Sequence, residues 1–332
     1  MTALFDEYSP WKASHFPERI DLLKKGELIP PVHLQIALTN ACNHSCCYCY
    51  VSEQNKCDEK LDTQVLLELL KDAKDIGVKA ITLAGGGEPT VHKDFYVITR
   101  KIRELGLELG VFTNGARLDV DELSFATWIR ISLDSFDTET YQSIRKSKMP
   151  DFEPIYRLCN ETNVVVGASL VITQYNYNQI YDFALKSKEI GFDYVWLNPV
   201  QLPEHPDILA PYWGEVEEQL VKVKELSSPK FKVFCPKSRV GAQGILHKPF
   251  EKCILQQFTA FIWTNGNIYP CCETQGIPGY AVGNIYNGRF KDVWFSRSPL
   301  EVKDCNFPCL RRDKNIFMNY LIDKDAPHRN FI

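Results

Sequence analysis

Short apolar runs alternate with longer amphipathic stretches along the first two thirds of the chain. The apolar runs are rich in β-branched residues and span residues 33–40, 79–85, 107–114, 128–135, 163–173 and 194–200. The stretches between them, at 62–76, 94–105, 119–126, 137–146 and 178–190, repeat apolar residues every three or four positions. This alternation predicts six strands, each joined to the next by helical structure.

Three of the predicted helices end on the same signal. Gly77, Gly106 and Gly191 can each take the left-handed turn that closes a helix, and an apolar run follows closely in each case. Asp62 is placed to cap the first of these helices. The repeated unit predicts parallel strands with right-handed crossovers, in either an incomplete barrel or a doubly wound sheet. In both folds, functional residues gather at the carboxyl ends of the strands.

The character of the chain changes after the predicted sheet. A long helical stretch at 205–226 and a strand at 231–236 are followed by a region richer in Gly, Pro, Cys and aromatic residues, with short strands near 260–270. We therefore predict an N-terminal extension (1–30), a main α/β domain (31–236), a small second domain (237–312) and a C-terminal tail (313–332).

Composition and charge narrow the class of protein. Of the 332 residues, 45% are hydrophobic and 24% are charged, and the formal net charge is −4. This balance is typical of a globular protein and argues against a broad nucleic-acid surface. No apolar run approaches the roughly 18–20 residues of a membrane span, and the first residues lack the basic-then-apolar order of a signal peptide. We expect a cytoplasmic protein without a membrane partner.

The 12 cysteines fall mainly into an early and a late group. Without an export signal, metal ligation is a better interpretation of such groups than disulfides. Cys42, Cys46 and Cys49 are spaced C-x3-C-x2-C directly after the first predicted strand. Three thiolates suit a [4Fe–4S] cube with one iron open to a further ligand, whereas zinc usually takes four protein ligands. A zinc knuckle or free thiols are the alternatives, and Cys47 offers a less usual register.

These residues resemble the signature of the radical S-adenosylmethionine (SAM) superfamily. Tyr48 is the aromatic residue that this family places before its last cysteine. The second predicted strand ends in Gly-Gly-Gly-Glu-Pro, which resembles the family's GGE motif and contains Gly86, Gly87 and Glu88. The resemblance implies that these glycines approach SAM closely, and that Glu88 or nearby carbonyls accept hydrogen bonds from its ammonium group.

The fourth predicted strand contributes a further part of the resemblance. Ser132-Leu133-Asp134 resembles the family's SLD strand, and Arg145 lies on the helix that follows. The resemblance implies that Ser132 and Arg145 hold the SAM carboxylate, which an arginine can bind through two parallel hydrogen bonds. Parallel strands would bring all of these segments to one rim of a partial (β/α)6 TIM barrel.

The late cysteines form a second candidate metal site. Cys253 and Cys271 frame a C-x12-G-x4-C pattern, and Cys305 and Cys309 follow as C-x3-C. Four thiolates fit either one auxiliary [4Fe–4S] cluster or a tetrahedral zinc ion. Cys272 is an alternative to its neighbour Cys271.

The segment between these cysteines resembles the auxiliary domains called SPASM and twitch. The resemblance rests on Gly283-Asn284-Ile285 and Asp292-Val293-Trp294, which match a GNI…W stretch. It implies one auxiliary [4Fe–4S] cluster in a small C-terminal twitch domain.

The resemblance implies radical chemistry on a bound substrate. Reductive cleavage of SAM gives a 5′-deoxyadenosyl radical, which takes a hydrogen atom from the substrate. An electron donor such as flavodoxin or ferredoxin is implied. The auxiliary cluster would then accept an electron, giving oxidation, whereas a hydrogen atom from Cys235 would give epimerisation. Cys235 as a buried strand cysteine is the alternative.

The substrate class is less constrained. We expect a small molecule (a sugar, aminocyclitol or natural-product precursor) or a short peptide, because the roughly 30 residues before the first strand are too few for a leader-binding domain. A ribosomal-peptide maturase is the alternative within the family. A zinc-stabilised, non-catalytic binding protein and an inactive scaffold are the alternatives outside catalysis.

Overall fold

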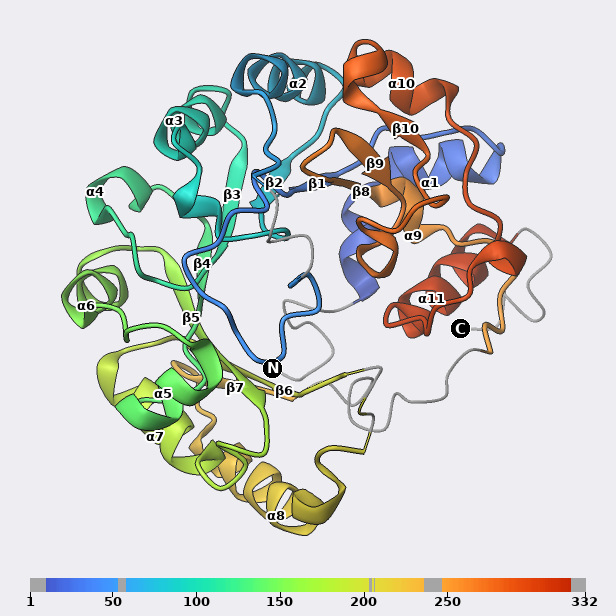
Figure 1. The fold of residues 1–332 in the computed structure, drawn as a ribbon. Helices are drawn as coiled ribbons and strands as arrows, with labels where there is room; N and C mark the ends of the chain where they lie inside the picture. Colours follow the sequence, from blue (N-terminus) through green and yellow to red (C-terminus); the bar gives the residue numbers. More distant parts are fainter. Residues whose placement is uncertain (1–9, 53–57, 203–204, 206, 236–246, 324–332) are drawn as a thin grey trace.

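The computed structural model describes residues 10–52, 58–202, 205, 207–235 and 247–323. Within this part of the chain, ten strands form one sheet in the order β10-β9-β8-β1-β2-β3-β4-β5-β6-β7 (Figure 1). The strands are β1 His33–Ile36, β2 Ala80–Leu83, β3 Glu108–Thr113, β4 Trp128–Ser132, β5 Val165–Ile172, β6 Tyr194–Pro199, β7 Lys232–Phe234, β8 Thr259–Ile262, β9 Asn267–Tyr269 and β10 Gly283–Asn284.

The sheet is a curved, unclosed barrel. All neighbouring strands from β8 through β7 pair in parallel, and only β9 and β10 run antiparallel to their neighbours. Strands β1 to β6 follow one another in sequence order, and their helices cover the outer side of the curve (Figure 1). The predicted partial (β/α)6 barrel is therefore confirmed, and the doubly wound alternative is wrong because the strand order does not reverse anywhere between β1 and β7.

The helices of the barrel are α2 Thr63–Asp75, α3 Phe95–Glu104, α4 Val120–Leu123, α5 Thr138–Arg145, α6 Phe152–Glu161, α7 Ile180–Ile190 and α8 Trp213–Lys222. Helices α2, α3, α5 and α7 begin and end close to their predicted positions, whereas α4 and α8 are shorter than the stretches predicted at 119–126 and 205–226. The Asp62 carboxylate caps α2 by accepting hydrogen bonds from the backbone amides of Gln64 and Val65. Gly77, Gly106 and Gly191 have φ of +91°, +63° and +106°, as the helix-end signal predicts.

Helix α6 is an addition to the prediction. It lies between α5 and β5, so the fourth crossover contains two helices. Only Ile155 and Leu158 are buried on α6, and Pro154 lies in its first turn, where proline is tolerated. An apolar stripe this narrow gives a weak sequence signal.

The two faces of the sheet are packed differently. A large aliphatic core fills the space between the strands and the outer helices. On the concave face, aromatic rings surround the Arg130 guanidinium, which lies 4.4 Å from the Trp196 ring centroid and 5.0 Å from that of Phe112. Gly167 makes room for the Tyr194 ring, since a Cβ there would come within 2.1 Å of it. The lower barrel is thus filled by side chains, and ligands must bind at the carboxyl rim.

The C-terminal region continues the barrel sheet. Strand β8 pairs in parallel with β1, with Leu34 opposite Ala260. The remaining helices, α1 Pro17–Lys24, α9 Leu255–Phe258, α10 Phe290–Ser296 and α11 Arg312–Ile322, lie on this side of the molecule (Figure 1). Helix α11 occupies much of the predicted tail and buries Met318 against Leu23 and Ile254. The proposed domain limits stay a prediction, and residues 236–246 at the expected boundary lie outside the described residues.

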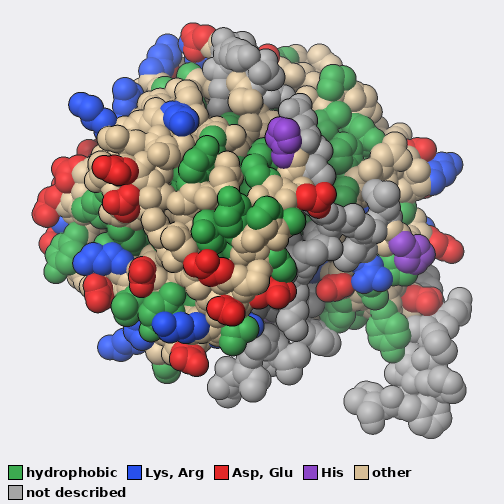
Figure 2. All heavy atoms as spheres, turned by 60° about the horizontal axis from the view of Figure 1, so that its bottom comes forward, with side chains coloured by type: hydrophobic (Ala, Val, Ile, Leu, Met, Phe, Trp, Pro, Cys, Tyr) green, Lys and Arg blue, Asp and Glu red, His purple; other side chains and the backbone are tan. Residues whose placement is uncertain are grey.

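The surface carries charges of both signs. Basic and acidic side chains are interspersed on the face shown in Figure 2. No helix in the described part of the chain is long and apolar enough to cross a membrane.

Candidate active site and auxiliary cysteine site

The C-x3-C-x2-C segment, residues 42–49 and here called the cluster loop, follows β1 at the carboxyl rim of the barrel. The Gly-rich turn after β2 holds the residues just before the loop, since the Gly87 amide donates to the Thr39 carbonyl at 2.7 Å. The end of α5 holds the loop itself, with the Cys47 amide donating to the Ile144 carbonyl at 2.9 Å. Strands β1, β2 and β4 therefore bring the three predicted motifs to one rim.

The glycines of the turn permit a close approach between two backbone segments. Gly85 and Gly86 have φ of +93° and +63°. A Cβ on Gly87 would lie 1.9 Å from the Ala41 carbonyl oxygen, where no side chain fits. We expected these glycines to approach a ligand, and the described contacts show them approaching the chain that enters the cluster loop.

Glu88 is buried and links the ends of β2 and β3 through hydrogen bonds. Its carboxylate accepts four hydrogen bonds, from the Thr90 amide and hydroxyl, the Thr113 hydroxyl and the Asn114 amide, at 2.7–3.1 Å. Burial raises the pKa of Glu88, while these donors oppose the shift. Only one of these bonds reaches Oε2, so one acceptor position there is left for a ligand such as an ammonium group.

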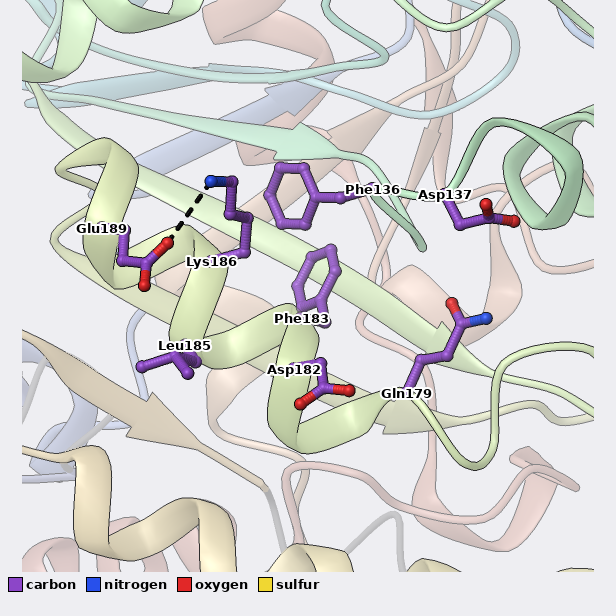
Figure 3. A pocket seen from close by; sticks show the side chains of 8 residues that line it. All are labelled: Phe136, Asp137, Gln179, Asp182, Phe183, Leu185, Lys186 and Glu189. Carbon is purple, nitrogen blue, oxygen red and sulfur yellow. Dashed lines mark hydrogen bonds and ion pairs between the residues drawn. The ribbon is translucent and has the colours of Figure 1, made fainter.

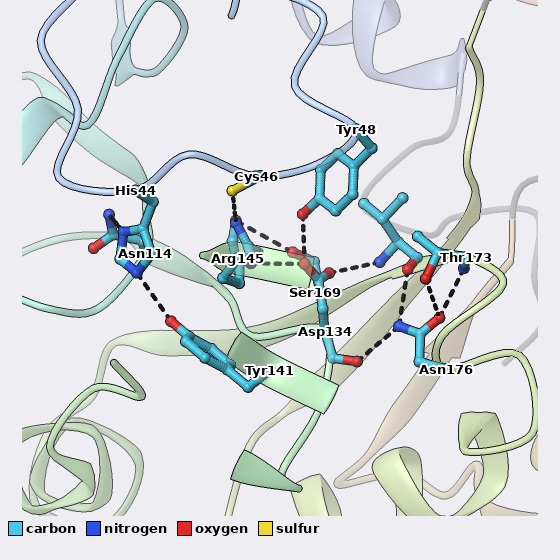
Figure 4. A network of polar contacts seen from close by, with 12 residues as sticks. His44, Cys46, Tyr48, Asn114, Asp134, Tyr141, Arg145, Ser169, Thr173 and Asn176 are labelled. Atoms are coloured by element: carbon cyan, nitrogen blue, oxygen red, sulfur yellow. Dashed lines mark hydrogen bonds and ion pairs between the residues drawn. The ribbon is translucent and has the colours of Figure 1, made fainter. Parts of the chain in front are cut away.

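Arg145 lies at the centre of a buried polar network (Figure 4). Its Nε lies 2.6 Å from the Asp134 carboxylate, and its Nη1 donates to Cys46 Sγ at 3.4 Å. Tyr48 donates its hydroxyl hydrogen to the same Asp134 oxygen at 2.5 Å. The Arg145 Nη2 is buried without a hydrogen-bond partner among the described residues. A buried guanidinium with an unused donor beside a cluster ligand fits an anionic group such as a carboxylate.

Asp134 is a site residue to which sequence analysis assigned no role. It has φ of +66°, which is uncommon for a residue other than glycine. Its Oδ1 accepts from the Val171 amide at 2.8 Å, and its carbonyl accepts from Asn176 Nδ2 at 2.9 Å. These contacts hold the carboxylate against Arg145 (Figure 4). The sequence signal that could have identified Asp134 is its place as the acidic residue of the SLD motif.

Ser132 and Arg145 lie on the same rim of the barrel. Ser132 is half-buried at the end of β4, and its hydroxyl lies 3.5 Å from that of Ser169 on β5. Their joint role in holding the SAM carboxylate stays a prediction.

His44 ties the cluster loop to β3 and α5 and was also missed by sequence analysis. Asn114 Nδ2 donates to His44 Nδ1 at 2.5 Å, so the ring proton lies on Nε2 and is donated to the Tyr141 hydroxyl at 3.1 Å (Figure 4). Burial, with a smaller contribution from Arg145, lowers the pKa of His44 to about 4 and keeps the ring neutral.

The three loop thiols are close enough to influence one another. Burial, the Glu88 carboxylate and the thiols of Cys46 and Cys49 raise the pKa of Cys42 to about 11. No three His, Cys, Asp or Glu side chains in the described part of the chain form a ready-made metal site. The all-thiol donor set, with a buried guanidinium beside it, nevertheless fits an iron–sulfur cluster that binds an anionic ligand.

The second cysteine group comes together in one cavity. Cys253, Cys271, Cys305 and Cys309 line the same largely apolar cavity between β9, α9 and α11. Asn315 Nδ2 approaches Cys253 Sγ at 3.5 Å and Cys309 Sγ at 3.9 Å. The four predicted auxiliary ligands are thus neighbours although they span 57 residues of sequence, and their all-thiol lining fits a fully ligated cluster.

Cys272 does not line this cavity. It packs with Tyr280 against the small core formed by Ala37, Val51, Phe261, Trp263 and Tyr269. Cys49 of the cluster loop packs against the same core. This arrangement favours Cys271 as the auxiliary ligand.

Cys235 faces away from the barrel interior. The preceding residue, Phe234, points inward and contacts the rings of Tyr194 and Trp196. Successive strand residues point to opposite faces, and Cys235 packs with Val233 against the outer core. Burial raises the pKa of its thiol. The packing therefore favours the buried strand cysteine over the hydrogen donor.

A shallow groove on the outside of the barrel is separate from both sites. It lies between the start of α5 and α7, where Phe136 stacks on Phe183 with ring centroids 5.1 Å apart (Figure 3). Lys186 and Glu189 form an exposed ion pair at its edge, at 3.3 Å. The groove is lined by no cysteine, and we assign it no part in catalysis.

Two family descriptions match the chain. The radical SAM superfamily matches residues 36–208, which is more than half of the chain, and an iron–sulfur cluster-binding domain of the SPASM type matches residues 253–316. The first match contains the cluster loop, the Gly-rich turn and Arg145, and the second contains the four auxiliary cysteines.

Curated relatives match part of the chain, and solved structures match most of it. A probable GTP 3′,8-cyclase of Saccharolobus islandicus is 28% identical over 223 residues, covering 63% of this chain and 70% of the relative. A probable GTP 3′,8-cyclase of Pyrococcus abyssi is 34% identical over 119 residues, covering 35% of this chain and 39% of the relative.

The structural neighbours share the fold at low identity. The crystal structure of Streptococcus suis SuiB bound to S-adenosylmethionine has a TM-score of 0.66 at 19% identity, covering 98% of this chain and 82% of SuiB. SuiB bound to its precursor peptide SuiA gives 0.65 at 18% identity, covering 97% and 80%. The structure of anSMEcpe with bound AdoMet gives 0.60 at 18% identity, covering 81% of each chain.

Proposed function

This chain belongs to the radical SAM superfamily and carries a SPASM-type domain, and we propose that it oxidises a small-molecule substrate by abstracting a hydrogen atom. The radical SAM domain implies a [4Fe–4S] cluster with SAM, and the SPASM domain implies auxiliary iron–sulfur chemistry.

The observation that carries the proposal is the arrangement of the two cysteine groups. Cys49 of the cluster loop and Cys272, next to Cys271 of the auxiliary cavity, pack against one small aromatic core. This neighbourhood supports electron transfer between a substrate held at the rim and an auxiliary cluster.

Each residue of the rim has a proposed task. Cys42, Cys46 and Cys49 would hold the barrel cluster, which together with SAM supplies a 5′-deoxyadenosyl radical when reduced. Arg145, through the Nη2 that lacks a described partner, would bind the SAM carboxylate with Ser132.

The remaining rim residues would orient SAM. Glu88 Oε2 and the carbonyls of Gly86 and Gly87 are the proposed acceptors for its ammonium group. Tyr48, whose hydroxyl is held by Asp134, would contribute the face of its ring.

The packing supports oxidation over epimerisation. Cys253, Cys271, Cys305 and Cys309 provide four thiolates, so an auxiliary cluster held by them has no iron open to substrate. The substrate would lose a hydrogen atom to the radical, then one electron to this cluster and one proton to the surroundings. Epimerisation would require a hydrogen atom from Cys235, whose side chain points away from the barrel interior.

The proposed substrate class follows the barrel relatives. The curated relatives are named for a reaction of GTP, a small molecule, and this supports a small-molecule substrate. A peptide maturase is the second candidate, because the fold over nearly the whole chain is shared with SuiB, whose structure is solved with its precursor peptide.

Anaerobic reconstitution tests the proposal. We expect a brown protein with about eight irons per chain, which releases 5′-deoxyadenosine from SAM when dithionite is added. Flavodoxin or ferredoxin should replace dithionite as the electron donor. A colourless protein with about two zinc ions per chain, or one that binds iron but does not cleave SAM, would contradict the proposal.

A further inference from the structure

Arg311 lines the same cavity as the four auxiliary cysteines. It lies between Cys309 and the first residue of α11, and it reaches across to strand β8. Its Nη1 donates to the Thr259 hydroxyl at 2.9 Å, and its guanidinium carbon lies 4.9 Å from the Phe261 ring centroid. These contacts fix the position of the charge at the cavity wall.

The surroundings of Arg311 are rich in thiols and contain no carboxylate at ion-pair distance. Within the described residues, Arg311 forms no ion pair. Burial lowers the pKa of Arg311. The nearby groups, which are Cys272, Cys271, Cys253 and Glu273, outweigh burial and raise the pKa overall. Lys248, which donates to the Cys305 carbonyl at 2.6 Å, is a second cation on the same wall.

A cation fixed beside four thiols needs a compensating anion. Arg311 is half-buried, and a charge partly withdrawn from water without a partner is costly. Thr259 and Phe261 offer only a neutral acceptor and a ring face. A [4Fe–4S] cube with four thiolates carries two negative charges when oxidised and three when reduced. A fixed positive charge therefore stabilises both states, and the reduced state more.

We infer that Arg311 compensates the negative charge of the auxiliary cluster and raises its reduction potential, so that the cluster accepts an electron more readily. This inference rests on the proposed assignment of Cys253, Cys271, Cys305 and Cys309 as ligands. Arg311 is a positioning and tuning residue here, since it acts on the substrate only through the cluster. A purely structural role, as a link between α11 and β8, is the alternative.

The test is an EPR-monitored redox titration of the auxiliary cluster in the full chain. Replacing Cys42, Cys46 and Cys49 by Ala removes the barrel cluster, so that one signal remains. In this background, Arg311→Gln and Arg311→Met should lower the potential by at least about 59 mV, a tenfold shift of the one-electron equilibrium towards the oxidised form. Arg311→Lys, which keeps the charge, should give a smaller change.

Arg312→Gln is the matched control. It removes the same charge one residue further on, from a side chain that is one-third exposed and pairs with Asp313 at 3.6 Å. Arg312 does not line the auxiliary cavity and its charge is paired with Asp313, so the potential of the Arg312→Gln variant should stay close to that of the parent chain.

The iron content separates the possible results. About four irons in the parent background shows that a second cluster is bound outside the cluster loop, as the ligand assignment requires, and their absence would reject that assignment before Arg311 is considered. If both neutral variants lose these irons and Arg311→Lys keeps them, charge compensation is supported directly. If all three variants lose them, or if the neutral variants keep both the irons and the parent potential, Arg311 is structural and the inference is overturned.

Discussion

Arg145 and Asp134 form a buried ion pair across the rim of the barrel, with Nε 2.6 Å from Oδ2 and side-chain exposures of 7% and 0%. The pair joins the end of α5 to the turn after β4. Because Arg145 also donates to Cys46, the pair connects the cluster loop to the sheet.

Asp134→Asn should destabilise the chain strongly. It leaves the Arg145 guanidinium buried without its counter-charge, and breaking a buried pair in this way typically costs about 3–5 kcal/mol. Urea unfolding followed by circular dichroism measures the change. Glu122→Gln, which breaks the exposed pair with Arg100, is the control and should have a much smaller effect. Equal losses for the two variants would contradict the importance of the buried pair.

Arg145→Lys should weaken SAM binding while keeping a positive charge near Asp134. Lysine has no second planar donor to replace Nη2, so one charged hydrogen bond of about 1.5–3 kcal/mol is lost. We expect the Kd for SAM to rise roughly ten- to hundredfold, measured by isothermal titration calorimetry of the reconstituted protein. Arg157→Lys on the exposed face of α6 should leave the Kd unchanged. An unaltered Kd in the Arg145 variant would remove this residue from the SAM site.

Cys271→Ala and Cys272→Ala should differ in iron content. Only Cys271 lines the auxiliary cavity, whereas Cys272 packs towards Trp263 and Tyr280. We expect the Cys271 variant to fall from about eight irons to about four and the Cys272 variant to keep about eight. The opposite pattern would show that Cys272 is the ligand.

Gly87→Ala should displace the cluster loop. The added methyl group would lie 1.9 Å from the Ala41 carbonyl oxygen, so one of the two backbone segments must move. Such overpacking typically costs about 1–3 kcal/mol, and we expect loss of the barrel cluster and of SAM cleavage. Gly214→Ala is the control, because a Cβ there meets no atom within 4 Å. Normal iron content and activity in the Gly87 variant would show that the close contact between the Gly-rich turn and the chain entering the cluster loop is not needed to position that loop.

Stability should fall as the pH is lowered from 7 to 5, in part because of His33. Burial, with a smaller contribution from Arg311, lowers the pKa of His33 to about 4, and its Nε2 contacts Thr82 at 2.8 Å. The unfolded chain, with a His pKa near 6.5, binds more protons over this range, so acid favours unfolding by at most about 2 kcal/mol for this residue.

His33→Gln should flatten this pH dependence. Burial also lowers the pKa of His44 and of His92, which contribute to the same slope, so the variant should lose only part of it. Urea unfolding at several pH values provides the measurement. A slope equal to that of the parent chain would show that His33 titrates normally.

Much of the barrel could be predicted from the sequence because its signals are local. Gly77, Gly106 and Gly191 mark helix ends through their own backbone conformation, and apolar spacing marks the elements between them. Helix α6 was missed because its buried stripe is narrow. The cluster loop and the Gly-rich turn were found because their residues are adjacent in the chain.

The polar network at the rim could not be predicted in the same way. The partners of Asp134 are Tyr48, Arg145 and Asn176, and those of His44 include Asn114 and Tyr141. Their separation in sequence says nothing about hydrogen-bond geometry. Arg311 was overlooked for the same reason, since its contacts lie on β8 and at distant cysteines.

The amino-acid order by itself determined the six repeated βα units and two groups of thiols, since periodicity, helix caps and cysteine spacing depend on neighbouring residues. Only the tertiary structure decided that β8 extends the sheet beside β1, that Cys271 faces the auxiliary cavity while Cys272 does not, and that Cys235 points outward. The physical reason is that strand pairing and side-chain orientation depend on which surfaces remain to be buried once the whole chain has packed.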